Sequence, residues 1–203
     1  MASTKTSAHR ESLRDRNKLN TRRAIHDAAL KLFAVQGYDA TTTEEIAVKA
    51  GVATRTFFRY FPTKEHVLYQ GEADWIQEFL DVYPAQPATL TDLEAMRVTL
   101  VGLTPQVMKA RRSMQLYQRA VESSPTLRGL EQDHYEQDAG ILAQAIAARR
   151  GRRRVDEACV LFAAVGLLAY RRAVEIWLAG PANGSLGSVI TKEFKLLKSQ
   201  LTG

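Results

Sequence analysis

Cysteine and histidine are scarce in this chain of 203 residues. Cys159 is the only cysteine, so an intrachain disulfide and a cysteine-based zinc cluster are both excluded. The four histidines, His9, His26, His66 and His134, are not spaced as ligands on one helix face. The inventory argues against a metal centre and a metalloenzyme, and we expect no cofactor.

Long hydrophobic runs are also missing. The longest, from Ala158 to Tyr170, is far shorter than the roughly 20 apolar residues that a membrane-spanning helix needs. The polar N-terminal segment has no hydrophobic stretch typical of a signal peptide. Because 45% of the residues are hydrophobic, the chain can still build a sizeable core. We therefore expect a cytoplasmic globular protein.

Negative charge is under-represented in the first third of the chain. Residues 1–64 hold 12 Lys and Arg against 6 Asp and Glu, whereas residues 65–203 hold 16 of each kind. The whole net charge of +6 therefore belongs to the first third, which predicts contact with a polyanion. For the densest part, from Lys5 to Arg23, charge alone fits a solvated, disordered tail equally well.

Alternation of period two, the signature of strands, is missing, and helical spacing replaces it. Ile25, Ala28, Ala29, Leu32 and Phe33, for example, follow the spacing of one helix face. The sequence predicts an all-α chain of about nine helices. They are expected at 20–36, 42–50, 53–61, 63–83, 91–103, 106–122, 125–149, 153–179 and 186–201.

Two of the short helices form a recognisable motif. Thr42 and Glu45 have the spacing of a capping box that opens a helix. Gly51 supplies a tight turn before the next short helix. Two short helices joined by such a turn predict a helix-turn-helix.

The segment from Thr21 to Leu68 resembles the DNA-binding domain of the tetracycline-repressor (TetR) family of bacterial regulators. Its most specific part, GVATRTFFRYFPTK from Gly51 to Lys64, is similar to the family pattern G-V-S-x-x-x-[LF]-[YF]-x-[YH]-F-x-[ST]-K. Ala53 stands where the family commonly has Ser or Thr. The resemblance implies a homodimeric repressor that a small apolar effector releases from a palindromic operator. It implies a flexible basic arm (1–19), a helix-turn-helix domain (20–66) and an effector-binding and dimerisation domain (67–203).

The helix that reads DNA must bury one face and expose the other. We expect Phe33, Ile46, Val52, Phe57 and Phe61 to be buried. The resemblance then implies DNA contacts by Arg14, Arg16, Thr42, Thr43, Ala53, Thr54, Arg55, Thr56, Phe58, Arg59, Tyr60 and Lys64.

Each kind of contact has its own chemistry. Arg55 suits bidentate contact with a guanine, and Thr56 a thymine methyl group or a phosphate. Tyr60, Lys64 and Thr42 are expected on phosphates, with Arg14 and Arg16 in the minor groove. Helix capping and solvated charge explain Thr42 and Lys64 equally well, and Phe58 has packing on a neighbour as its alternative.

The remainder of the chain loosely resembles the TetR subgroup typified by mycofactocin regulators, through FPTKEHVLYQGEADW and LAYRRAVEIWL. That resemblance implies an acyl-CoA-like ligand, with Arg119, Arg171 or Arg172 on its acidic groups. The expected lining residues are Trp75, Phe79, Met96, Leu100, Met114, Tyr117, Arg119, Tyr135, Phe162, Tyr170, Arg171 and Trp177. Plain core packing and surface charge are the alternative explanations for each of them.

The last two helices are expected to pair with a second copy of the chain, as they do in the family. The implied interface comprises Val155, Leu161, Leu168, Ile176, Leu186, Ile190, Phe194 and Leu197. The helix at 63–83 would transmit effector binding to the DNA-reading helix. The rival interpretation is an all-α enzyme or carrier, although no known catalytic motif accompanies it.

Overall fold

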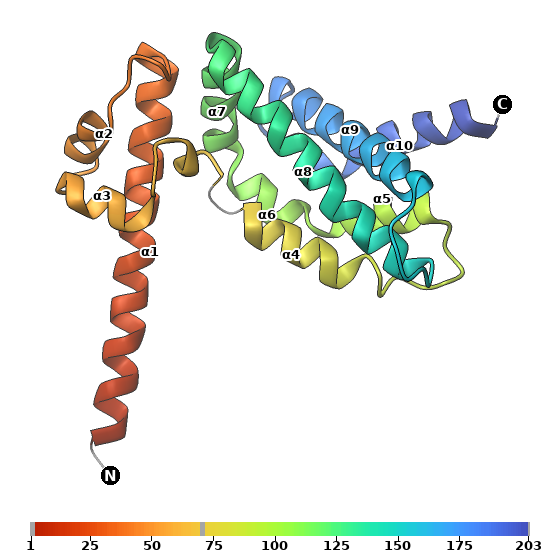
Figure 1. Cartoon of the computed structure of the whole chain (residues 1–203), viewed down its shortest axis with the longest axis horizontal. Coiled ribbons are helices and arrows are strands. Elements are labelled where there is room, and N and C mark those ends of the chain that lie inside the picture. The colour runs from red at the N-terminus through yellow and green to blue at the C-terminus, as the bar shows by residue number, and fades with distance from the viewer. Residues whose placement is uncertain (1–2, 70–71, 203) are drawn as a thin grey trace. The chain divides into compact units, whose positions relative to one another are not determined.

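The computed structural model describes residues 3–69 and 72–202, with side chains for residues 16–69 and 75–200. Across these residues the predicted all-α class is confirmed (Figure 1). The helices are α1 (Ser3–Gln36), α2 (Thr43–Lys49), α3 (Thr54–Tyr60), the 3-10 helix η1 (Glu65–Val67), α4 (Glu72–Val82), α5 (Asp92–Gly102), α6 (Thr104–Lys109), α7 (Arg111–Ser123), α8 (Pro125–Arg149), α9 (Glu157–Ala179) and α10 (Leu186–Thr202). No helix within the described ranges is both long and apolar enough to cross a membrane.

The chain forms two compact units. The first, the N-terminal unit, comprises residues 1–70 and 116–127; the second, the C-terminal unit, comprises residues 71–115 and 128–203. The boundaries at 115/116 and 127/128 fall within α7 and α8, so both helices contribute to both units.

The N-terminal unit is a three-helix arrangement of α1, α2 and α3 (Figure 1). The capping box at the start of α2 is present, because the Glu45 amide donates to Thr42 Oγ1 and the Thr42 amide donates to Glu45 Oε2. Gly51 ends the turn after α2 with a φ of 70°, a conformation that a side chain would strain. Phe33 and Ile46 are completely buried between the helices. These local signals explain why the predicted helix-turn-helix forms.

Three of the predicted helices need correction. α1 begins at Ser3 instead of residue 20, because the intervening sequence consists largely of helix-compatible residues and contains neither glycine nor proline. The helix predicted over 63–83 is not continuous, since η1 is a single 3-10 turn and α4 begins at Glu72. Glycine is a poor helix former, and Gly71 lies between them in the sequence. The segment at 106–122 likewise divides at Ala110, whose φ of −89° and ψ of 3° interrupt the helix.

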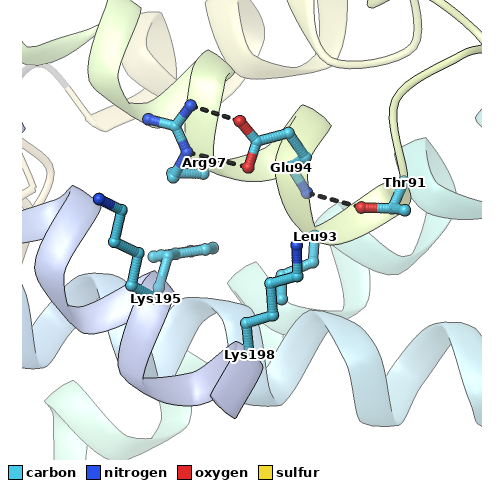
Figure 2. A pocket seen from close by; sticks show the side chains of 7 residues that line it. Thr91, Leu93, Glu94, Arg97, Lys195 and Lys198 are labelled. Carbon is cyan, nitrogen blue, oxygen red and sulfur yellow. Dashed lines mark hydrogen bonds and ion pairs between the residues drawn. The ribbon is translucent and has the colours of Figure 1, made fainter. Parts of the chain in front are cut away.

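The C-terminal unit is built around α5, α9 and α10, with α10 packed on both other helices. Gly166 of α9 lies so close to Met96 of α5 that a Cβ atom there would overlap the Met96 sulfur. Figure 2 shows how α5 begins: Thr91 caps the helix, and Glu94 accepts a 3.1 Å hydrogen bond from Arg97 Nε. Lys195 and Lys198 of α10 line a small pocket of about 30 Å³ beside this pair.

Arg149, at the end of α8, holds the connection between α4 and α5. Its guanidinium donates hydrogen bonds to the carbonyl oxygens of Gln86, Pro87 and Leu90. It also forms an ion pair with Asp92 at 3.3 Å, and only 6% of its side chain is exposed. This arginine therefore satisfies backbone acceptors of a segment that lacks helical hydrogen bonds.

Candidate nucleic-acid interface

One face of α3 is exposed while aromatic rings hold its opposite face in the core. Phe57 is completely buried, and Phe61, immediately after the helix, is 1% exposed. Arg55, Phe58 and Arg59 are exposed. The other predicted contact residues of this segment are the exposed Ala53 and the half-buried Thr54, Thr56 and Tyr60. The buried rings therefore position a helix whose long outward side chains can meet a partner.

Arg55 is well placed for direct contact with a ligand. It lies in the first turn of α3, after the extended N-cap residue Ala53. Among the described side chains, none forms a hydrogen bond or ion pair with Arg55. An unpaired guanidinium offers two parallel donors, which match the N7 and O6 acceptors of guanine.

Phe58 combines packing with exposure. Its ring meets Phe57 edge-on, with the centroids 5.3 Å apart and an interplanar angle of 84°. The side chain nevertheless stays 48% exposed. One edge therefore supports α3 while the rest of the ring is available for apolar contact.

An open groove of about 520 Å³ runs between α1 and the end of α3. Asn17, Lys18 and Thr21 line it from α1, and Arg59 and Tyr60 line it from α3. The Arg59 guanidinium lies 5.1 Å from the centroid of the Tyr60 ring. The groove combines positive charge with amide and hydroxyl groups, which are the groups that bind phosphate oxygens.

No sequence pattern pointed to the three α1 residues of this groove as DNA contacts. With the helix expected only from residue 20, the preceding residues fall within the predicted flexible arm. Had the helix been extended toward the N-terminus, Asn17 and Thr21 would have fallen four residues apart, on one face.

Three predicted DNA contacts, Thr42, Thr43 and Lys64, have structural partners of their own. Thr42 caps α2, and Thr43 Oγ1 donates to Glu44 at 3.0 Å. Lys64 Nζ donates to the carbonyl oxygens of Tyr38 and Thr41 at 2.9 and 3.2 Å. These contacts organise the loop between α1 and α2.

Tyr38 and Glu65 fasten the same loop to η1. The Tyr38 hydroxyl donates to the Glu65 carboxylate. Burial, followed by this acidic partner, raises the pKa of Tyr38 well above its ordinary value. The hydroxyl therefore stays protonated and continues to donate.

Arg14 and Arg16 both lie within α1. The Arg14 side chain is outside the described side chains, and Arg16 is exposed. Their assignment to the minor groove stays a prediction.

The predicted effector-lining residues fall into three groups. Phe79, Met96, Leu100 and Trp177 are buried in the core of the C-terminal unit, and Trp75, Met114, Tyr135, Phe162 and Tyr170 pack against that core. Tyr117 and Arg119 belong instead to the N-terminal unit. Arg171 is exposed and forms an ion pair with Glu175 at 3.3 Å. Within the C-terminal unit, the structure thus brings six aromatic members together, Trp75, Phe79, Tyr135, Phe162, Tyr170 and Trp177, while Arg171 stays exposed.

The predicted dimer residues divide by exposure. Leu186, Ile190 and Phe194 of α10 are buried in the core of their own unit, so a second chain is not needed to cover them. Leu197 is half-buried. Val155, Leu161, Leu168 and Ile176 are between 40% and 67% exposed.

A basic three-helix unit with a rigidly held, outward-facing third helix defines a helix-turn-helix DNA-binding domain. Comparison with known proteins agrees. Residues 25–69 match the family model described as bacterial regulatory proteins of the tetR family, and residues 92–202 match that of the MftR C-terminal domain. The HTH-type transcriptional regulator TcmR of Streptomyces glaucescens is 33% identical over 155 residues, which cover 73% of this chain and 69% of TcmR.

Two solved structures share the fold. FadR of Thermus thermophilus, a TetR-family repressor in complex with lauroyl-CoA, has a TM-score of 0.51 and 22% identity, covering 90% of this chain and 95% of that chain. The SmeT–triclosan complex has a TM-score of 0.62 and 17% identity, covering 89% and 90%.

The chain therefore belongs to the TetR family of bacterial regulatory proteins. It is a DNA-binding transcriptional regulator, and proteins of this family are regulators rather than enzymes. The family resemblance read from Gly51 to Lys64 is confirmed, as is the resemblance of the C-terminal part to the mycofactocin-regulator subgroup.

Proposed function

We propose that this chain is a ligand-responsive repressor that binds a palindromic operator as a homodimer and releases it when a small, largely apolar effector binds. The observation that carries the proposal is the combination, in α3, of a buried Phe57 with the exposed Arg55, which has no hydrogen-bond or ion-pair partner among the described side chains. A helix fixed in this way can insert its first turn into the major groove. The site of action is the bacterial cytoplasm, where the operator lies.

The DNA contacts divide into reading and positioning contacts. Arg55 reads a guanine and Thr56 contacts a thymine methyl group or a phosphate. The groove between α1 and α3 holds the sugar-phosphate backbone, with Lys18 and Arg59 supplying positive charge. Arg14 and Arg16 extend this contact toward the minor groove.

Dimerisation is supported by the exposed apolar residues of α9. Leu161 and Leu168 are 67% and 54% exposed, and their spacing of seven residues places them on one helix face. Ile176 adds to the exposed apolar surface on the same helix. Two copies joined along α9 and α10 would place their α3 helices on successive turns of the operator, about 34–36 Å apart.

The effector is assigned to the core of the C-terminal unit. FadR and SmeT, which share the fold, were solved with lauroyl-CoA and triclosan, so an acyl-CoA-like and an aromatic effector are both consistent with the architecture. Binding shifts the population toward a conformation that the operator does not accept. Since the predicted helix 63–83 is interrupted, the signal is carried through α7 and α8, whose residues belong to both units.

The experiment is a fluorescence-anisotropy titration against a selected pool of genomic DNA at two salt concentrations. We expect recovery of a palindromic site whose affinity falls steeply with salt while a sequence-specific difference persists. Arg55→Ala should weaken specific binding by about 1–3 kcal/mol and relax the preference at one base pair. Arg153→Ala, which removes an equal charge from an exposed loop residue, is the matched control. Weak binding without sequence preference at both salts would refute the proposal.

A further inference from the structure

The end of α7 and the start of α8 form the segment Leu116–Leu127, which belongs to the N-terminal unit. We call this segment the elbow. The remaining residues of both helices belong to the C-terminal unit. Ala120 and Leu127 are 0% and 1% exposed, yet neither is part of the hydrophobic core of the C-terminal unit. Two helices of the C-terminal unit are thus anchored in the unit that carries α3.

Ser124 lies at the bend of the elbow and caps α8. Its hydroxyl oxygen accepts a 3.2 Å hydrogen bond from the Leu127 amide, and Pro125 follows as the first residue of the helix. The same hydroxyl donates a 2.9 Å hydrogen bond to the Asp39 carboxylate. Ser124 is only 1% exposed, and a hydrogen bond to an ionised group is strong where water is shielded on one side. A specific, directional contact therefore holds the elbow to Asp39.

Asp39 belongs to the loop between α1 and α2, residues 37–42. Within this loop Thr41 Oγ1 donates to the Gly37 carbonyl oxygen at 2.7 Å, which braces the loop internally. The loop ends at Thr42, the residue that caps α2. Because α2 packs on both α1 and α3, a shift of this loop changes how α2 and α3 are held.

The negative charge of Asp39 does not suit contact with DNA. The first third of the chain carries the whole net positive charge, and a carboxylate within it repels phosphate groups. Asp39 is exposed, and its carboxylate accepts the hydrogen bond from Ser124. Holding the elbow accounts for an acidic residue at this position, whereas binding of DNA does not.

We propose that the hydrogen bond between Ser124 and Asp39 couples the C-terminal unit to the helix-turn-helix. The inference rests on the proposed function, because it names the residues through which effector binding reaches α3. A change in the angle between α7 and α8 displaces Ser124, and the hydrogen bond passes that displacement to the loop and to the start of α2. Asp39 and Ser124 are thus positioning residues, which touch neither operator nor effector. An element of this kind couples two sites when both of them bias its position.

The test is hydrogen–deuterium exchange of the full chain, measured by mass spectrometry with and without saturating selected operator DNA. Coupling between two sites is reciprocal, so operator binding at α3 must act back on the C-terminal unit. In the wild-type chain we expect the operator to slow exchange in α2 and α3 and also, by roughly fivefold or more, at residues 128–149 of α8. In Asp39→Ala the slowing in α2 and α3 should persist, while the response of residues 128–149 should be lost.

Three further variants separate coupling from folding. Asp39→Asn keeps an oxygen that can accept from Ser124, so it should retain most of the α8 response. Ser124→Ala removes the donor, and combining it with Asp39→Ala should cause no further loss of that response. Ser123→Ala is the matched control, because the neighbouring hydroxyl donates within its own helix, to the Ala120 carbonyl oxygen, and its response should equal that of the wild type.

Thermal melts show whether each variant is folded, and fluorescence anisotropy shows whether the operator is bound. Ser124→Ala also deprives the Leu127 amide of its cap; if either this variant or Asp39→Ala unfolds, the other decides alone. With operator bound, an equal α8 response in wild type and the folded variant, or no α8 response in the wild type, overturns the inference and leaves the proposed repressor intact. A folded Asp39→Ala chain that no longer binds operator would place Asp39 in the DNA interface and overturn the inference as well. Failure of the wild-type chain to bind any selected operator refutes the proposed function itself, and the inference with it.

Discussion

The ammonium group of Lys64 lies 4.1 Å from the centroid of the Tyr38 ring and donates a 2.9 Å hydrogen bond to the Tyr38 carbonyl oxygen. The same group also donates to Thr41. One side chain thus holds the loop that leads into the capping box of α2. A lysine that sequence comparison places on DNA therefore has a demonstrable role inside the domain.

Lys64→Met should accordingly destabilise the N-terminal unit. The substitution keeps most of the apolar stem but leaves two carbonyl oxygens without their charged donor, and we expect a loss of about 1–3 kcal/mol in the free energy of unfolding. Urea denaturation measures it, with Lys31→Met on the exposed face of α1 as the control. Unchanged stability in Lys64→Met would show that the loop holds without this lysine.

Lys18→Ala should behave in the opposite way. Lys18 lines the groove between α1 and α3, so its loss should weaken binding to every DNA sequence by a similar factor and leave stability almost unchanged. The slope of log affinity against log salt should decrease in magnitude by about 0.9, the value for one phosphate contact. Lys192→Ala, on α10, removes the same charge far along the chain and should not change the slope. An identical slope in Lys18→Ala and wild type would exclude Lys18 from the interface.

The contrast between these lysines shows what the sequence could and could not reveal. The helix-turn-helix was predictable because its signals are local. Thr42 and Glu45, which form the capping box, are three residues apart, and the turn at Gly51 depends only on the backbone conformation of that one residue. The partners of Lys64 are the carbonyl oxygens of Tyr38 and Thr41, in the loop between α1 and α2. They are far from Lys64 in the sequence, and no spacing rule connects them to it. The family pattern therefore identified Lys64 as a residue of the DNA-binding domain but did not reveal which groups its ammonium contacts.

The predicted effector site shows the same limit of sequence-based prediction more strongly. Helical spacing placed Trp75 and Phe79 on one face of α4, but the stack on Tyr170 depends on how α9 packs, which is a tertiary property. The expected lining set joins these residues with Tyr117, another large side chain on a helix, and with Arg119, which is expected on the acidic groups of the ligand. The structure assigns Arg119 and Tyr117 to the other unit, and only packing could have made that distinction.

The close approach of α9 to α5 at Gly166 predicts a stability effect. Gly166→Ala would bring the new Cβ into overlap with the Met96 sulfur, in a core where Met96 is completely buried. Overpacking of this kind costs about 1–3 kcal/mol, although a flexible methionine absorbs part of it. Gly129→Ala on α8, where a Cβ meets nothing within 4 Å, should instead be neutral or stabilising by up to about 1 kcal/mol.

Thermal unfolding followed by circular dichroism compares these variants. In a double-mutant cycle, Gly166→Ala should cost less in a Met96→Ala background, because the overlapping sulfur is then absent. Additive effects of the two substitutions would contradict the steric explanation.

The exposed leucines of α9 predict how the chain assembles. Leu161 and Leu168 form an exposed apolar strip on α9, and contact with a second chain would cover it. A charged side chain at either position would lose its hydration in that interface and so disfavour the dimer. We expect the wild-type chain to sediment at twice its mass of 22.7 kDa and the double variant Leu161→Glu, Leu168→Glu to sediment as a folded monomer. Val35→Glu, at an apolar position of α1 that is 86% exposed, should remain dimeric.

The monomer should bind a single half-site weakly, since it loses the avidity that two linked α3 helices provide. A wild-type chain that is monomeric at micromolar concentration, or a double variant that stays dimeric, would place the partner surface elsewhere and leave this strip unexplained.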